Sequence, residues 1–284
     1  MIRIITDTTS DIQVDEARRL GVDLVPLKVI FGEASYLEAF EISMDDFYKR
    51  LVSVTELPTT SQPAPADFLP FFEEVKAAGD SAGVLLISGA ISGTVQSATI
   101  AKDMVGYDQI HIIDSRTTII GLRLLVEYAV RMREEGLDVE TICEELERAK
   151  HRVVLLAALD TLDYLYMGGR LSRAGKIAGT LLNFKPVITL RDGALSVVGK
   201  GRGVKRAIET IFSTMDDLPE ADACTAPIYF GYTATPDKTE ILIEEACHRY
   251  GFSNTRTHPV GCVVGTHAGP GACVIVYLAK DPVF

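Results

Sequence analysis

Several short segments of this 284-residue chain combine hydroxyl side chains with the glycines and prolines that are typical of loops. The segment 58–63 reads Pro-Thr-Thr-Ser-Gln-Pro, and Thr60 is its central hydroxyl residue. The segment 88–94 reads Ser-Gly-Ala-Ile-Ser-Gly-Thr, and Ser92 comes just before a helical pattern. A helix N-terminus has free N–H groups and a positive dipole end, so the second segment is suited to binding an anion.

Two further segments carry a positive or a titratable group. In 168–172, Gly-Gly-Arg-Leu-Ser, the side chain of Arg170 offers a planar fork for a carboxylate or a phosphate. In 266–271, Thr-His-Ala-Gly-Pro-Gly, His267 lies among loop-forming residues. Simpler interpretations stay open for all four segments. The hydroxyls could cap helices, the arginine could be solvated on a surface loop, and the histidine could be structural.

Two other patterns, a GxSxG match and a basic run, are weaker indications of a functional site. The run 79–83 matches the GxSxG pattern of hydrolases, but that motif needs the order strand, turn, helix. Here a helix precedes the turn and a strand follows it, so we expect Ser81 not to be catalytic. The basic run 200–206 could contact a phosphate or a partner, or could be a solvated helix start.

Composition excludes several classes of function. The formal net charge of −11 argues against a nucleic-acid surface and against general adhesion to anionic membranes. The five cysteines include no CxxC pair, so we expect no metal site and reduced thiols. The chain has no apolar run of about 18 residues and no signal-peptide layout, which predicts a cytoplasmic protein.

Apolar runs alternate with amphipathic stretches in the first half of the chain. This rhythm predicts a Rossmann-like α/β domain over residues 1–150, with a mostly parallel sheet, helices on both faces and ligands at the carboxyl ends of the strands. The predicted strands are Ile2–Thr6, Val22–Phe31, Val84–Ser88 and Ile110–Asp114, and the predicted helices are Val14–Leu20, Asp45–Val52, Phe68–Ala78, Thr94–Val105, Gly121–Glu135 and Val139–Lys150.

The pattern changes in the second half, where a hairpin stands beside helices. It predicts a mixed-sheet α/β domain over residues 151–284, with a tight turn at Asp192-Gly193. The predicted strands are Val153–Leu159, Pro186–Leu190, Leu195–Val198, Ile228–Tyr232, Val260–Gly265 and Cys273–Leu278, and the predicted helices are Ala174–Phe184, Val204–Met215 and a stretch from Thr235 to about Tyr250.

The order of the motifs along nearly the whole chain resembles that of the DegV family of fatty-acid-binding proteins. This resemblance implies two α/β domains that enclose one long-chain fatty acid at their interface, with its carboxylate on Thr60 and Ser92 and with no other cofactor. It rests on Thr-Asp-Thr-Thr-Ser-Asp (6–11), the segment 58–63, Ile-Ser-Gly-Thr (91–94) with Gln96-Ser97-Ala98, Ile-Asp-Ser (113–115), Tyr164-Leu165 before Gly-Gly-Arg, Lys185-Pro186, and His267 with Gly-Pro-Gly (269–271).

The resemblance also implies a partner, an ATP-dependent fatty acid kinase subunit to which this carrier presents the carboxylate. Arg170 and His267 would then act around the acyl phosphate, where a protonated imidazole could add positive charge. Transient membrane contact is compatible with this role. The chain departs from the family in having Ser88-Gly89 instead of Ser-Ser, Asp7-Thr8 instead of Asp-Ser, and Tyr166-Met167 instead of basic residues before Gly-Gly-Arg.

Functions of other classes remain as alternatives. The chain could be a stand-alone phosphotransferase or hydrolase that uses His267 or Ser81, although no complete triad or nucleotide loop is visible in the sequence. It could also be a lipid sensor or storage protein without a kinase partner. The sequence alone does not separate a carrier from a sensor.

Overall fold

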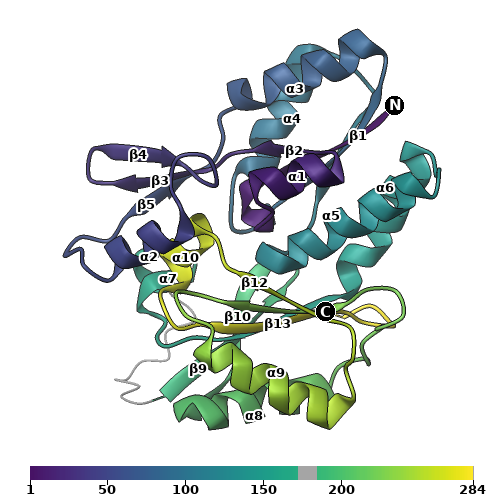
Figure 1. Ribbon diagram of the computed structural model, residues 1–284. Helices are drawn as coiled ribbons and strands as arrows, with labels where there is room; N and C mark the ends of the chain where they lie inside the picture. The colour runs from purple at the N-terminus through teal and green to yellow at the C-terminus, as the bar shows by residue number, and fades with distance from the viewer. Residues whose placement is uncertain (172–183, 284) are drawn as a thin grey trace.

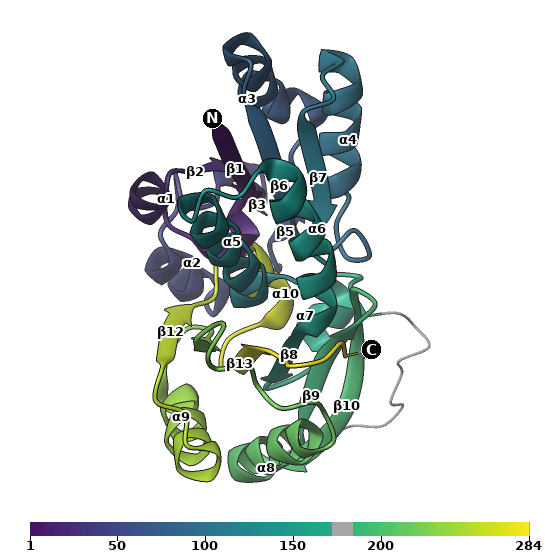
Figure 2. The same ribbon diagram turned by 90° about the vertical axis from the view of Figure 1, so that its right-hand side faces the viewer.

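The computed structural model describes residues 1–171 and 184–283 and arranges them in alternating layers of helices and sheets (Figures 1 and 2). The predicted helix Ala174–Phe184 lies outside the described residues except for Phe184, which begins a strand. Within the described ranges, no helix is both long enough and apolar enough to span a lipid bilayer.

The N-terminal sheet is parallel throughout, as predicted, and has the strand order β2-β1-β6-β7. Helices cover both of its faces, which confirms the predicted α/β architecture. The strands are β1 (Ile2–Asp7), β2 (Val22–Val25), β6 (Ser81–Leu86) and β7 (Ile110–Asp114). One face packs on α3 (Pro65–Ala78) and α4 (Thr94–Val105), and the other on α1 (Val14–Leu20), α5 (Ile119–Glu134) and α6 (Val139–Ala149).

The predicted strand Val22–Phe31 is wrong as a single element. Proline has no N–H group for the sheet ladder, and Pro26 follows the last residue of β2. The chain then enters a separate antiparallel sheet of β3 (Lys28–Phe31), β4 (Ala34–Leu37) and β5 (Thr59–Ser61). The segment 58–63, expected to be a loop, therefore supplies a short strand in which Thr60 pairs with Val29.

The C-terminal sheet has six strands in the order β10-β9-β8-β13-β11-β12 and mixes parallel with antiparallel pairs, as predicted. Asp192 and Gly193 both have positive φ, so the predicted tight turn does join β9 to β10. The strands are β8 (Val153–Ala158), β9 (Phe184–Arg191), β10 (Ala194–Arg202), β11 (Ile228–Tyr232), β12 (Thr255–Pro259) and β13 (Cys273–Leu278), and α8 (Gly203–Asp216) and α9 (Asp237–Tyr250) pack on one face.

Helix α5 lies between the two large sheets, as Figure 2 shows. A single hydrophobic core runs from Ile4 of the parallel sheet through Leu125 of α5 to Val274 of the mixed sheet. The division of the chain at residue 150 stays a prediction, because this core and a C-terminal helix both cross it.

That crossing helix is α10 (Cys262–Ala268), and the predicted strand Val260–Gly265 is wrong. A short apolar run fits a buried strand and a buried helix equally well, so periodicity could not decide between them. Helix α10 packs beside α2 (Met44–Leu51), β3, β5 and α7 (Asp163–Met167), between the mixed sheet and the antiparallel sheet of β3, β4 and β5 (Figure 1).

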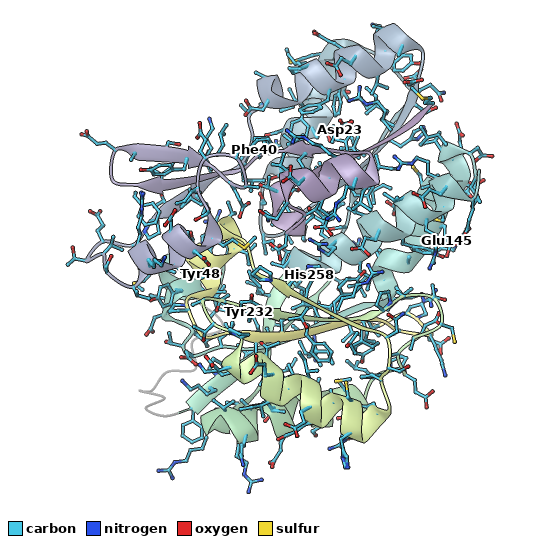
Figure 3. All side chains as sticks on the ribbon, in the orientation of Figure 1. Asp23, Phe40, Tyr48, Glu145, Tyr232 and His258 are labelled. Atoms are coloured by element: carbon cyan, nitrogen blue, oxygen red, sulfur yellow. The ribbon has the colours of Figure 1, made fainter. Side chains whose placement is uncertain are left out.

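Two buried carboxylates from the N-terminal half hold the start of α10. The backbone N–H of Gly261 donates to Asp11 Oδ1 at 2.9 Å, and that of Val263 donates to Glu38 Oε1 at 2.8 Å. The hydroxyl of Tyr48, labelled in Figure 3, donates to the carbonyl of Val260 at 2.9 Å. These bonds satisfy backbone groups at the helix entry that would otherwise be buried without partners.

Burial makes this attachment sensitive to pH. It raises the pKa of Glu38 to about 7, although hydrogen bonds from Val263 and Thr8 act in the opposite direction. Burial also raises the pKa of Asp11 well above its usual range. At pH values between the pKa of each carboxyl group in the unfolded chain and its raised pKa in the folded chain, the folded chain keeps a proton that the unfolded chain has released. The free energy of unfolding therefore falls as the pH rises through that window.

We predict that Glu38→Gln flattens this fall between pH 5 and pH 8, because the amide cannot ionise. Relative to wild type, the variant should gain up to about 3 kcal/mol in the free energy of unfolding on going from pH 5 to pH 8. Denaturant unfolding at both pH values measures the gain, and Glu33→Gln in the exposed β3–β4 turn is the control. Equal pH dependence in all three proteins would contradict the prediction.

Candidate functional site

A mostly apolar cavity lies between the two large sheets and α10. Its empty space, including open solvent at the mouth, is about 840 Å³. Its walls come from the carboxyl end of the parallel sheet, the start of α5, the inner face of the mixed sheet and α10. Representative apolar wall residues are Ile87, Ile119, Leu155, Ile188, Val263 and Val274.

The four residues singled out from the sequence all line this cavity, although they are far apart in the chain. Thr60 comes from β5 and Ser92 from the loop before α4, whereas Arg170 follows α7 and His267 lies near the end of α10. The carboxyl ends of the parallel strands therefore contribute to the cavity, as predicted. The specific role of each side chain stays a prediction.

We call the polar part of the wall, formed by Thr60, Ser92, Arg170 and His267, the mouth of the cavity. In it, His267 of α10 contacts Thr60 of β5. Its Nε2 atom lies 2.9 Å from the hydroxyl oxygen of Thr60, and its Nδ1 atom is buried without a hydrogen-bond partner in the described part of the chain. Burial, and then the nearby charge of Arg170, lowers the pKa of His267 to about 4. Both effects favour the neutral imidazole over the imidazolium in this structure, and a protonated His267 beside an acyl phosphate stays a prediction.

The hydroxyl of Ser92 is not used as a helix cap. It lies 2.8 Å from the hydroxyl of Thr94, whereas Gly93 occupies the capping position of α4 and has no side chain to offer. Above this helix start lies the amide of Gln62, and a Cβ atom at position 93 would come within 2.2 Å of Gln62 Oε1. Ser92 and Gln62 thus bring one hydroxyl and one amide at this helix entry to the cavity wall.

Arg170 carries a charge that no acidic residue neutralises within residues 1–171 and 184–283. Its Nη1 donates to the carbonyl of Gly168 at 2.7 Å, and its Nε lies 3.5 Å from the carbonyl of Ile91. Both partners are backbone oxygens, which orient the guanidinium without neutralising its charge. Through Ile91 the arginine is also linked to the loop that carries Ser92.

Sequence reasoning missed three polar residues of the cavity. Gln62 was read only as part of a hydroxyl motif, and Thr118 and Thr233 were not considered. Position 62 could have been suspected because it belongs to the same motif as Thr60. The two threonines have no comparable signal, because neither belongs to the motifs described above.

The remaining sequence candidates lie elsewhere. Ser81 is the first residue of β6, opposite Ile2 of β1, and the cavity loop follows the other end of that strand. Among the described residues, the run 200–206 contributes nothing to the cavity wall. In the same ranges, no group of three His, Cys, Asp or Glu side chains is placed to hold a metal ion.

Comparisons with known proteins agree on one family. A family model described as "Uncharacterised protein, DegV family" matches residues 1–280. A DegV domain-containing protein of Caldanaerobacter subterraneus is 38% identical over 282 residues, which cover 98% of this chain and 99% of that protein.

Solved structures show the same similarity. A DegV family protein from Thermus thermophilus, described by its fatty acid binding, has a TM-score of 0.88 at 33% identity and covers 98% of this chain and 99% of its own. The fatty acid kinase (Fak) B3 protein of Streptococcus pneumoniae, loaded with linoleic acid, has a TM-score of 0.85 at 22% identity and covers 99% of this chain and 100% of its own. The second similarity concerns the fold alone.

We predict that Gly168→Ala displaces the imidazole of His267, because a Cβ atom at position 168 would lie 2.1 Å from its Nδ1 atom. Overpacking of this kind costs about 1–3 kcal/mol of stability. Gly83→Ala is the control, since a Cβ there makes only ordinary contacts of 3.6 Å or more. Nuclear magnetic resonance of the His267 ring should change in the first variant only, and an unchanged ring signal in Gly168→Ala would refute the prediction.

Proposed function

Because this chain belongs to the DegV family, we propose that it binds one long-chain fatty acid in the cavity and holds the carboxylate at the mouth. We propose further that it acts as a carrier without activity of its own and presents this carboxylate to an ATP-dependent kinase subunit. The observation that carries the proposal is an apolar cavity whose hydroxyl, imidazole and guanidinium groups gather at one place.

The apolar wall supports an acyl chain as the ligand. Burial of a methylene group contributes about 0.8 kcal/mol, so about 14 methylenes contribute a gross gain of about 11 kcal/mol. Ordering the chain and losing free translation reduce this gain. Because a membrane gives a similar gain per methylene, the polar contacts of the head group have to supply the preference for the protein.

The mouth supports a carboxylate as the head group. If His267 carries its proton on Nε2, it donates to the oxygen of Thr60, and the hydroxyl hydrogen of Thr60 is then free to donate to the ligand. Ser92 adds a second hydroxyl beside the N-terminus of α4. Hydroxyl donors lower the cost of burying the carboxylate without neutralising it, so the group keeps its nucleophilic character.

In the coupled reaction, a carboxylate oxygen would attack the γ-phosphorus of ATP, and the bond from that phosphorus to the bridging oxygen would break. The products are an acyl phosphate and ADP. Arg170 has only backbone carbonyls as partners among the described residues, so its charge is available for the added negative charge. The nucleotide site would belong to the partner, because the sequence contains neither a Walker motif nor a GxGxxG motif.

A hydrolase that uses the Thr60–His267 pair is less well supported. A hydroxyl nucleophile and its imidazole base need a third group that orients the ring, and Nδ1 of His267 has no such partner in the described ranges. The sensor alternative predicts the same ligand but no turnover with a kinase. Coupled turnover therefore separates a carrier from a sensor.

We predict that the purified protein contains about one fatty acid per chain. Thr60→Val and Ser92→Ala should each weaken the binding of the fatty acid about tenfold, since each removes a hydrogen bond to a charged group.

We predict that the Arg170→Ala variant keeps the bound fatty acid but forms acyl phosphate with the kinase about a hundredfold more slowly, because the added negative charge loses its cation. Lipid mass spectrometry and coupled turnover measure the two effects, with Ser81→Ala as the control. A lipid-free protein that also refuses added palmitate and oleate would exclude the proposed function.

We also predict that fatty acid binding raises the pKa of His267, because a nearby carboxylate favours the imidazolium form. Burial lowers the pKa of His258 to about 4 as well, but His258 does not line the cavity and is the internal control. Nuclear magnetic resonance titration of both rings, before and after lipid loading, tests this. A shift that is equal at both histidines, or absent from His267, would contradict a carboxylate at the mouth.

A further inference from the structure

The N-terminal motif Thr-Asp-Thr-Thr-Ser-Asp (6–11) has no role in the function proposed above. Its last residue, Asp11, is buried and has a positive φ of 59°, a left-handed conformation that aspartate adopts more readily than most residues. The carboxylate of Asp11 accepts from the backbone N–H of Gly261 at the entry of α10. The orientation of Asp11 therefore contributes to where α10 lies.

A buried arginine of α5 holds the backbone of Asp11. Arg123 Nη2 donates to the carbonyl oxygen of Asp11 at 2.7 Å, and the side chain of Arg123 is only 1% exposed. Glu16 of α1 accepts two further bonds from the same guanidinium, at 2.6 and 2.7 Å. Arg123 thus forms a bidentate ion pair with Glu16 and a charge-assisted hydrogen bond to Asp11.

The charge of Arg123 also acts on the carboxyl group of Asp11. Burial raises the pKa of Asp11, and the charge of Glu38 acts in the same direction. The hydrogen bond from Gly261 and the charge of Arg123 act in the opposite direction. Loss of the guanidinium would therefore remove both a hydrogen bond to the backbone of Asp11 and a favourable charge near its carboxylate.

His267 is linked to this attachment through the backbone of α10. The N–H of Gly265 donates to the carbonyl of Gly261 at 2.8 Å, and the N–H of Gly269 donates to the carbonyl of Gly265 at 2.9 Å. These bonds run along the helix from its entry to its end. The helix also packs closely, because a Cβ atom at position 265 would lie 2.4 Å from the hydroxyl oxygen of Tyr48. We therefore expect a displacement of Gly261 to move the imidazole.

We propose that Arg123 is a positioning residue of the candidate site. By fixing Asp11 it fixes the entry of α10, and the helix in turn holds the imidazole of His267 against the hydroxyl of Thr60. Arg123 does not line the cavity, so its effect on the ligand is indirect. A displacement of about 1 Å that starts far from the reacting atoms is sufficient to impair a site that depends on orientation. The consequence for the ligand rests on the proposed function, whereas the link from Arg123 to His267 does not.

The first measurement needs no ligand. In lipid-free protein, the nuclear magnetic resonance signal of the His267 ring should change in Arg123→Met, which keeps an unbranched side chain and removes its donors. Arg3→Met is the matched control, because Arg3 also pairs with two carboxylates but lies near the beginning of β1. An unchanged His267 signal in Arg123→Met, or an equal change in Arg3→Met, would overturn the inference.

Circular dichroism establishes that each variant is folded. If Arg123→Met does not fold, Arg123→Lys takes its place, since lysine keeps the buried charge but lacks the planar fork that reaches both partners. The same change of the His267 signal is expected in Arg123→Lys. An unchanged signal in that variant would likewise overturn the inference.

The second measurement is the affinity of delipidated protein for palmitate. Arg123→Met should weaken binding about tenfold, as Thr60→Val does, because Thr60 loses the imidazole that orients its hydroxyl. Combining the two changes should add no further loss, because both act on the same hydroxyl. An additive loss of about a hundredfold would show that Arg123 does not act through Thr60 and would overturn the inference. If the wild-type protein binds no palmitate, the proposed function fails and the His267 signal still decides the inference.

Discussion

The bonds from the start of α10 to the buried carboxylates of Asp11 and Glu38 determine how the cavity mouth is assembled. They place a helix from the end of the chain against β3 and β5, which come from its beginning. His267, near the end of that helix, therefore meets Thr60 on β5. Without this attachment the apolar wall of the mixed sheet would remain, but the polar mouth would lose its imidazole.

The attachment of α10 to Asp11 and Glu38 requires the burial of ionisable groups, which is unfavourable for their charged forms. Two carboxylates and the imidazole of His267 are buried close to the cavity, and burial shifts the pKa of each toward its neutral form. The site consequently contains neutral hydrogen-bonding groups, with Arg170 as a cation that no acidic residue neutralises in the described part of the chain. Neutral hydrogen-bonding groups beside one unneutralised cation suit a protein that holds a lipid by burial and leaves the head group chemically available.

Local sequence determined most of the regular elements. The helices Val14–Leu20 and Thr94–Val105 and the strands Ile110–Asp114, Ile228–Tyr232 and Cys273–Leu278 begin and end where periodicity predicts. The two wrong strand predictions have different causes, a local one at Pro26 and a tertiary one at the apolar run 260–265. The chain leaves the parallel sheet after Pro26, and the apolar run 260–265 becomes helical because distant carboxylates bind its first N–H groups.

The sequence by itself determined the α/β class, the tight turn of the hairpin and the four motifs that carry Thr60, Ser92, Arg170 and His267. Each of these depends on residues that are close together in the chain. Only the tertiary structure decided that the four side chains share one cavity and that burial lowers the pKa of His267. The physical reason is that burial, pKa and the presence of a hydrogen-bond partner depend on neighbours in space, which α10 and the two sheets bring from opposite ends of the chain.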